Sequence, residues 1–274
     1  MGFKITDGVL MSYIQEEGTT SVVIPDGIKR IAFGAFVGCA NITSVTMPDS
    51  VTSIGGAVFE RCSNLKAITL SQNITKISEM LFDSCKNLKY VTIPNNVTSI
   101  EHHAFNCCIS LTTITIPENV KRIEYNAFCF CENLTSVIIE NNAIVIEQEA
   151  FNECKNLTDL FVRGYQIHGN FGAIKNFTQK LNDAISMLDN KDFSVKLEKE
   201  LKIPFILAYY RKTKDETAFT YIKKNFTKMF KFLIDQNDIE TIEAIICSGE
   251  FLTKRNIDKM IDYAIEKERH EIYV

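Results

Sequence analysis

Cysteine and histidine are the residues in this sequence that could attack a substrate or hold a metal, and their spacing indicates whether they do. Six of the nine cysteines recur at a fixed interval of 23 residues: Cys39, Cys62, Cys85, Cys108, Cys131 and Cys154. A metal or catalytic site needs several residue types brought together, whereas one type at a fixed period fills the same position in every repeat. We therefore interpret these six as reduced thiols that pack as small buried side chains.

The other candidates for metal chemistry are too few or badly spaced. His102 and His103 are adjacent, but no third ligand follows at a recognisable spacing. Cys107 and Cys129 lie just upstream of two of the periodic cysteines and could approach each other in stacked repeats. Buried and rim positions of such repeats would not converge on a tetrahedral site. We therefore expect no metal and no cofactor.

Catalytic motifs are equally scarce. The sequence contains no glycine-rich phosphate loop, and none of its four histidines lies in a recognised catalytic motif. Cys247, in Ile-Ile-Cys-Ser-Gly, is the one cysteine that could serve a ligase-type reaction, and its spacing predicts a buried helix face without an acid partner. We expect no enzyme activity and no small-molecule substrate.

The periodic cysteines belong to a 23-residue unit that occurs six times and then opens a seventh strand. The units begin at Val22, Val45, Ile68, Val91, Ile114 and Val137, and Leu160 starts the seventh strand. Phenylalanine occupies positions 36, 59, 82, 105, 128 and 151, and isoleucine occupies 31, 54, 77, 100, 123 and 146. Asparagine fills a further position at 41, 64, 87, 133 and 156, where we expect its side chain to bond backbone groups in the turn. Such regularity predicts a solenoid.

Two local patterns fill each unit. Alternating β-branched residues, as in Val137-x-Ile139, predict a short strand with one buried face, and proline at 25, 48, 94 and 117 ends it. The apolar residues between Ile123 and Cys131 are spaced as in a short helical turn. No single unit can bury its own apolar residues, so the units must stack into one continuous core. The predicted fold is an α/β solenoid with a parallel sheet on its concave face.

This unit resembles the leucine-rich repeats of the BspA-like family, whose pattern is I-P-x-x-V-x-x-I-x-x-x-A-F-x-x-C-x-x-L. Residues 3–13, beginning Phe-Lys-Ile-Thr-Asp-Gly-Val-Leu, also resemble the lead-in of that family. The resemblance covers about half of the chain. It implies a curved solenoid used for adhesion or protein recognition, often on the surfaces of host-associated bacteria and some protozoa.

The remaining chain predicts helices. We expect an N-terminal capping segment at 1–21, the solenoid at 22–163 and an all-α domain at 164–274, joined by a turn-rich stretch at 163–170. The expected helices are 173–189, 194–211 with Pro204 as a break or kink, 215–234, 238–247 and 254–268. Asp238 and Thr253 are expected N-caps and Gly249 a stop. This region weakly resembles an ankyrin-like array, and its helices are expected to cover the open last turn of the solenoid.

Partner binding is expected on the outward side chains of the concave strands and the positions just before them. The candidate residues are Thr46, Lys66, Thr69, Lys89, Tyr90, Thr92, Thr115, Asp159 and Phe161. The threonines fit a recognition surface or simply the strand propensity of threonine. Lys66, Lys89 and Tyr90 are the expected anchor, because tyrosine offers a large contact area with a polar end. Ile138 and Phe161 could instead be covered by the C-terminal domain.

Composition and charge narrow the classes of partner that the chain is expected to bind. Hydrophobic residues make up 46% and charged residues 23% of the chain, which is typical of a folded soluble protein, and the net charge of −4 provides no global attraction to nucleic acid. Between Lys196 and Lys231 basic residues interleave with aromatics, but the aromatic spacing fits buried helix faces better than a nucleic-acid site. No apolar run is long enough for a membrane span.

The sequence thus predicts a module that recognises a macromolecule, with a protein as the expected partner. A cell-surface adhesin or host-interaction effector using the same face is the alternative, and an enzyme in the helical domain is the third. As written, the sequence shows no signal peptide, which indicates a cytoplasmic protein. A removed signal or a non-standard route would place it on the surface or outside the cell.

Overall fold

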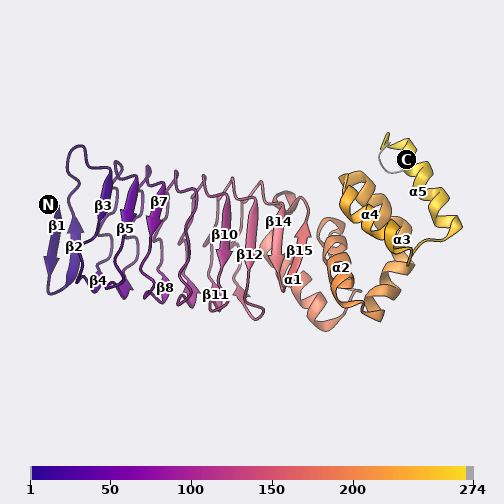
Figure 1. Cartoon of the computed structure of the whole chain (residues 1–274), viewed down its shortest axis with the longest axis horizontal. Coiled ribbons are helices and arrows are strands. Elements are labelled where there is room, and N and C mark those ends of the chain that lie inside the picture. The colour runs from indigo at the N-terminus through magenta and orange to yellow at the C-terminus, as the bar shows by residue number, and fades with distance from the viewer. Residues whose placement is uncertain (1, 270–274) are drawn as a thin grey trace. The chain divides into compact units, whose positions relative to one another are not determined.

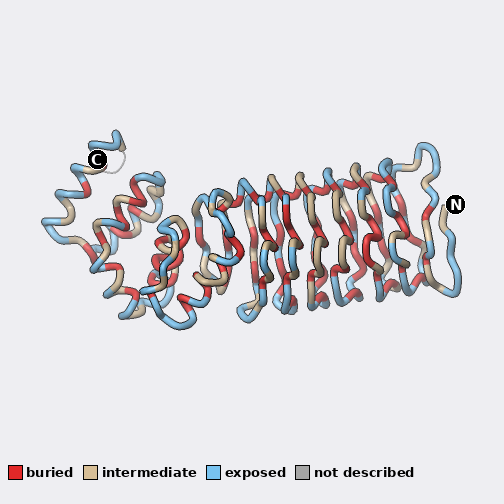
Figure 2. The backbone as a smooth tube through the Cα atoms, turned by 180° about the vertical axis from the view of Figure 1, so that it is seen from behind, coloured by how far each residue is buried: buried red, intermediate tan, exposed pale blue. Residues whose placement is uncertain are grey.

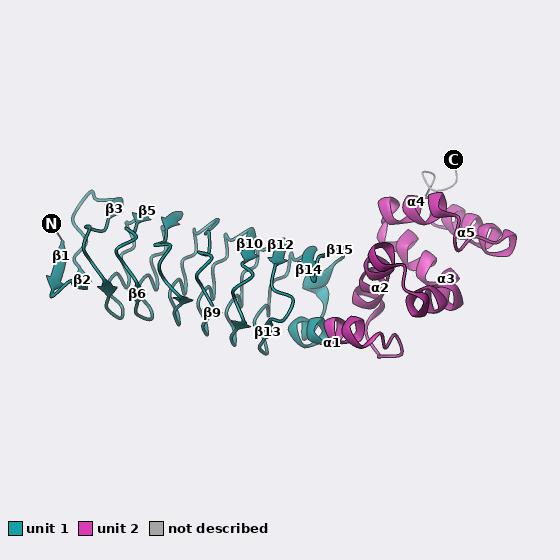
Figure 3. Cartoon of the chain, turned by 60° about the horizontal axis from the view of Figure 1, so that its bottom comes forward, with its two compact units in different colours: residues 1–182 teal, residues 183–274 magenta. Residues whose placement is uncertain are grey.

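The computed structural model describes residues 2–269. They divide into a first unit that ends at Asn182 and a second unit that begins at Asp183 (Figure 3). The first unit is a coil of parallel strands and the second is helical, so the predicted solenoid followed by a helical region is confirmed. The division falls inside helix α1 (Phe177–Asn190).

Most turns of the coil carry a strand of one row and then a shorter strand of a second row (Figure 1). The first row, called the strand face below, contains β3 (Ser21–Val23), β5 (Ser44–Thr46), β7 (Ala67–Thr69), β10 (Thr113–Ile116), β12 (Ser136–Ile139) and β14 (Asp159–Val162). The second row contains β4 (Arg30–Ile31), β6 (Ser53–Ile54), β8 (Lys76–Ile77), β9 (Ser99–Ile100), β11 (Arg122–Ile123) and β13 (Val145–Ile146). Paired residues such as Ile114 and Val137 stand one repeat apart, which fixes the register.

The expected helical turn between Ile123 and Cys131 is wrong. This stretch begins with strand β11 and continues as successive turns, because Asn126 and Phe130 have positive φ angles of 56° and 57°. A right-handed helix cannot pass through such left-handed residues. The same pair recurs in every turn, beginning with Gly34 and Gly38. Its backbone bonds run to the next turn, as when Phe105 N donates to Ala127 O at 2.7 Å.

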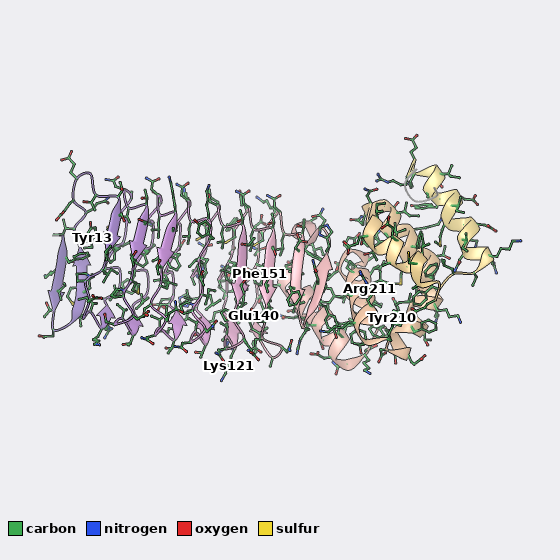
Figure 4. All side chains as sticks on the ribbon, in the orientation of Figure 1. Tyr13, Lys121, Glu140, Phe151, Tyr210 and Arg211 are labelled. Atoms are coloured by element: carbon green, nitrogen blue, oxygen red, sulfur yellow. The ribbon has the colours of Figure 1, made fainter. Side chains whose placement is uncertain are left out.

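A column of phenylalanine rings forms the centre of the coil. The rings of Phe36, Phe59, Phe82, Phe105, Phe128 and Phe151 follow one another with centroids 5.0–5.7 Å apart. All six are buried, and Figure 2 shows buried positions recurring in each turn. Tyr13 extends the column by stacking on Phe36 at 4.9 Å, and Figure 4 labels Tyr13 and Phe151 towards opposite ends of the coil.

The periodic cysteines are free thiols, as predicted, and they also act as hydrogen-bond donors. The Sγ of Cys108 lies 3.2 Å from the carbonyl oxygen of Phe82 in the preceding turn. Four other periodic cysteines make the same bond at 3.0–3.2 Å: Cys62, Cys85, Cys131 and Cys154. Burial raises the pKa of Cys62 to about 12 and that of Cys108 well above its ordinary value. The thiols therefore stay protonated and bonded inside the coil.

Asparagine side chains form ladders along the turns. Asn87 and Asn156 donate from Nδ2 to the carbonyls of Ser63 and Glu132 at 2.8 and 2.9 Å, which confirms the predicted role for these two of the five asparagines. A second ladder was not predicted from the sequence. In it, Asn73, Asn96 and Asn119 donate to carbonyls of the preceding turn at 2.7–2.8 Å.

Both rows are interrupted once. The expected strand at Val91–Ile93 does not form. This segment separates β7 from β10, and within residues 2–269 no ladder hydrogen bond from the neighbouring turns reaches its peptide groups. The second row is interrupted between β6 and β8. There the Ser78 hydroxyl donates to Ile54 O at 2.7 Å, in place of the backbone bond that the equivalent Glu101 N makes to Ile77 O in the next turn.

Antiparallel strands end the coil. Strands β1 (Phe3–Thr6) and β2 (Val9–Tyr13) form a hairpin, and β2 joins β4 in parallel. At the other end β15 (Tyr165–His168) turns back onto β14, where the sequence predicted only a turn-rich junction. The short 3₁₀ helix η1 (Phe171–Ala173) follows.

Two side chains in the first two turns of α1 make hydrogen bonds to the last repeat. Thr178 Oγ1 accepts from Phe151 N at 3.1 Å, and Asn182 Nδ2 donates to Ile146 O at 2.8 Å. The backbone N–H of Phe151 and the carbonyl of Ile146 in the last repeat therefore have partners within the first unit.

The second unit contains α2 (Lys199–Thr213), α3 (Glu216–Gln236), α4 (Ile239–Ser248) and α5 (Lys254–Glu266), with α3 packed against the other three. These helices, and α1, lie within a few residues of the predicted ranges. Pro204 lies inside α2 and does not end it. Asp238 and Thr253 cap α4 and α5, and Gly249 ends α4 at a φ of 63°, as predicted.

The phenylalanine column predicts where the coil is most sensitive. We expect Phe105→Ala to lower the free energy of unfolding by about 3–5 kcal/mol, because it leaves a cavity between two stacked rings. Urea denaturation followed by circular dichroism measures the loss. Phe130→Ala is the matched control, since Phe130 is 42% exposed in the next turn, and its change should stay within about 0.5 kcal/mol. Equal losses from the two variants would contradict the ring column as the core.

The buried thiols predict alkaline destabilisation. In reducing buffer, the free energy of unfolding should fall as the pH rises above 9.0, the ordinary thiol pKa, towards about 12, because the unfolded chain then releases protons that the native chain retains. Each buried thiol contributes up to about 1.4 kcal/mol per pH unit. Urea titrations at about pH 8 and about pH 10.5 test this. Cys108→Ala should make the fall smaller and Cys247→Ala should not, and equal slopes in both would refute the explanation.

Candidate interaction surface

The strand face presents two columns of outward side chains, because alternate strand residues point to opposite sides of a sheet. The first column contains Ser21, Ser44, Ala67, Tyr90, Thr113, Ser136 and Asp159, and the second contains Val23, Thr46, Thr69, Thr92, Thr115, Ile138 and Phe161. The residue between the two columns in each turn, such as Ile68 or Ile114, is buried. The face is therefore built on the core without contributing to it.

The structure exposes most of the sequence-predicted site residues. Lys66, Lys89, Tyr90 and the four threonines Thr46, Thr69, Thr92 and Thr115 are exposed, as is Phe161, while Asp159 is half-buried. Lys66 and Lys89 precede equivalent positions of adjacent turns, and Lys89 N lies 3.5 Å from Lys66 O. Asp159 is three turns further along than Tyr90, roughly 14 Å at the usual spacing of strands. The candidates thus form one group around Tyr90 and another around Asp159.

Tyr90 is the one large side chain in a column of small ones. Its neighbours in the column are Ala67 and Thr113, and its side chain is 64% exposed. Nothing in this column is large enough to cover the ring. An aromatic ring in such a position gives a partner a large, rigid contact with a polar end.

Tyr90 borders a hollow of about 310 Å³ at the interruption of the strand face. Its lining consists of Tyr90, Val91, Thr92, Ile93, Asn95, Thr113, Thr115, Pro117 and Glu140. The hollow therefore runs from the beginning of the strands at Tyr90 to their end at Glu140, which is labelled in Figure 4. The sequence predicted Tyr90 as part of an anchor but missed Asn95 and Glu140, whose positions give no signal outside the folded coil.

Two lysines beside this face stand in equivalent positions of adjacent turns without a counter-charge in the described part of the chain, whereas some other lysines of the coil are paired. Lys76 pairs with Glu101 at 2.9 Å and Lys155 with Glu132 at 3.1 Å, each across adjacent turns. Within the described residues 2–269, Lys66 and Lys89 have no acidic partner, although the two stand in equivalent positions of neighbouring turns. Two like charges side by side without a counter-charge repel each other. Neither lysine lines the hollow, but Lys89 directly precedes Tyr90 at its edge, so positive charge lies beside this end, whereas Glu140 lines the other end.

The second group, Asp159 and Phe161, lies on β14 at the end of the coil. His168 on β15 stands opposite Asp159 on β14, with Nδ1 and Oδ1 2.9 Å apart, and Thr158 donates to the same carboxylate. Partial burial raises the pKa of Asp159, but these two hydrogen bonds outweigh it, and the pKa lies below its usual value. Asp159 thus joins β14 to β15, a role that the sequence did not indicate. Phe161, opposite Gln166, is 39% exposed.

The histidine and cysteine residues that were considered for metal binding or catalysis, such as His102 and Cys247, lie apart from the strand face. His102, in the turns after the second row, lies between Glu79 and Glu124 at 3.4 and 3.7 Å. Within the part of the chain that the structure describes, no group of three or more His, Cys, Asp or Glu residues is placed to hold a metal ion. Cys247 is exposed on α4, so its expected burial is wrong, because Ile242 and Ile245 form the buried side of this helix.

The basic and aromatic residues of the second unit separate as predicted. The aromatics of the helix interiors are buried: Phe205, Tyr209, Tyr210, Phe226, Phe230 and Phe232. Lys223, Lys224 and Lys228 lie exposed on α3, and the Lys202 ammonium covers the half-buried Tyr221 ring at 4.9 Å. Of the helices in residues 2–269, none is both long and apolar enough to cross a membrane.

Comparison with known proteins agrees with this architecture. A family model described as a BspA type leucine-rich repeat region matches residues 12–134 and 81–192 and contains six copies of the repeat. Comparison with curated proteins gives no significant match.

Solved structures of similar coils come from several bacteria. A leucine-rich repeat protein of T. pallidum is 27% identical with a TM-score of 0.52, and the match covers 59% of this chain and 79% of that one. One from Bacteroides ovatus is 26% identical with a TM-score of 0.49, covering 59% and 52%. The pneumococcal vaccine antigen PcpA shares the fold at 20% identity and a TM-score of 0.50, covering 57% and 39%.

The family match spans the coil and reaches into α1. Its repeat is the unit whose Phe, Cys and Asn ladders hold the turns together. The chain therefore belongs to the family of BspA-type leucine-rich repeat proteins.

Proposed function

We propose that this chain is a recognition module that binds a protein partner through the strand face around Tyr90. The observation that carries the proposal is the exposed Tyr90 ring beside a hollow. Lys66 and Lys89 lie next to the ring and have no acidic partner among the residues that the structure describes. Repeat solenoids offer extended surfaces of this kind to partners. An exposed aromatic side chain at a depression is typical of the centre of a protein interface, and charged side chains such as lysine are typical of its rim.

The distribution of hydrogen bonds supports the choice of face. Thr43, Thr52, Thr98 and Thr135, which lie off the outward columns, use their hydroxyls to bond backbone carbonyls of the preceding turn. Thr69, Thr92 and Thr115 also lie in the part of the chain that the structure describes, and their hydroxyls make no such bond. They are therefore available as donors and acceptors for a partner without loss of a bond that holds the coil.

The second row is a poorer candidate for binding because its charged side chains hold the turns together. Arg122 pairs with Glu147 at 3.0 Å, and Glu147 also accepts from Tyr125 N at 3.0 Å. Glu101 serves Lys76 and Glu79 N in the same way. A partner that took these side chains would break contacts between turns. The proposal assigns the chain binding and no reaction.

The proposal predicts loss of partner binding without loss of fold. The variant Tyr90→Ala with Lys66→Glu and Lys89→Glu should bind a partner identified by affinity capture at least about tenfold more weakly, because it removes the aromatic anchor and reverses both charges. Quantitative mass spectrometry of the captured material, followed by a binding titration with the purified partner, measures this. Circular dichroism should show an unchanged coil.

A matched control carries the same kinds of change on the other row. Phe33→Ala with Lys29→Glu and Lys121→Glu removes a ring that is 62% exposed and reverses two exposed lysines. This control should retain the partner. Capture that is unchanged in the Tyr90 variant, or lost equally in the control, would refute the assignment to the strand face.

A further inference from the structure

We propose that Lys66, Lys89 and the hollow beside Tyr90 bind an extended acidic segment of the partner, with a carboxylate of that segment between the two lysines. This inference rests on the proposed function and deepens it by naming the chemistry of the partner. It depends on three features of the same place: a pair of uncompensated charges, an interrupted ladder and a hollow of about 310 Å³.

The charges indicate an anionic group. Some lysines of the coil are neutralised by an acidic side chain of a neighbouring turn, as Lys76 is by Glu101. Lys66 and Lys89 have no acidic partner among the described residues, and they are like charges in equivalent positions of adjacent turns. Both side chains are exposed, so each can turn towards a common ligand. A carboxylate between them replaces a repulsion with two charge-assisted hydrogen bonds.

The hollow indicates an extended chain. Val91 and Ile93 contribute to its lining, and the ladder bonds found in other turns are missing at their peptide groups. These peptide groups lie in the plane of the sheet between two neighbouring turns, so a ligand's own N–H and C=O groups would find their partners among the side chains that line the hollow. Thr92, Thr113 and Thr115 add hydroxyls along the same strands. The lining of the hollow extends from Tyr90 to Asn95 along one turn, a length that suits a segment of roughly five residues at 3.3 Å each.

The far end of the hollow sets the direction of the segment. Glu140 lies there and is exposed, so a second carboxylate of the ligand would be repelled at that end. The acidic residue of the segment therefore belongs at the lysine end. A nucleic-acid strand fits this face less well, because its regular row of phosphates would meet Glu140 and, further along, Asp159.

The test uses a phage-displayed library of random heptapeptides, selected on the full native chain. We expect the selected peptides to be enriched in Asp and Glu. A representative peptide, labelled with fluorescein, should bind about tenfold more weakly to the variant Lys66→Gln with Lys89→Gln in an anisotropy titration, and its affinity should fall with added salt. The matched control, Lys29→Gln with Lys121→Gln, loses the same charge on the other row and should bind as the native chain does.

The outcomes separate this inference from the proposed function. One outcome would overturn the inference and leave the proposed function standing. In it, the selected peptides lose binding to the Tyr90→Ala variant, show no enrichment in acidic residues, and bind unchanged to the double lysine variant. A library that yields no Tyr90-dependent peptide overturns both. Binding of labelled oligo-dT that is lost in the double lysine variant, with no acidic peptides selected, would show a nucleic-acid surface instead.

Discussion

The coil depends on one constraint: the polar and apolar groups of each turn find their partners in the neighbouring turn. Phe105 packs between the rings of adjacent turns, and Cys108 donates its thiol proton to the carbonyl of Phe82. The side-chain amide of Asn87 likewise donates a hydrogen bond to the carbonyl of Ser63. A single turn would expose its apolar side chains and leave these groups unpaired, so the register of one turn fixes that of the next. The strand face, the hollow and the second row all follow from this repetition.

Periodicity made the coil predictable because it records which side chains face inward. The phenylalanine, isoleucine and cysteine positions predicted the core, and the asparagine position predicted a ladder of side-chain bonds. The second row of strands was missed because two-residue strands such as β11 are too short to alternate. The left-handed residues were also missed, since Asn126 and Phe130 share no residue type with Met80 and Ser84 in an earlier turn.

The candidate surface was predicted only in part. Tyr90, Lys66 and Lys89 stand out from the sequence because they depart from the repeat, and the structure places them together. The hollow does not stand out, because it depends on the missing strand at Val91–Ile93, whose sequence is as strand-like as that of its neighbours. Strand β15 escaped prediction for a similar reason. It runs against the direction of the repeat, so it carries no trace of the period.

The two interruptions of the coil are staggered along its length. The second row opens between β6 and β8, whereas the strand face opens between β7 and β10, about one turn further on. At each opening the opposite row remains continuous, so the coil has two successive joints that yield on opposite sides. Fewer hydrogen bonds resist separation of the turns there than elsewhere in the first unit. A force along the coil would therefore be taken up at its middle, next to Tyr90, while the capped ends kept their shape.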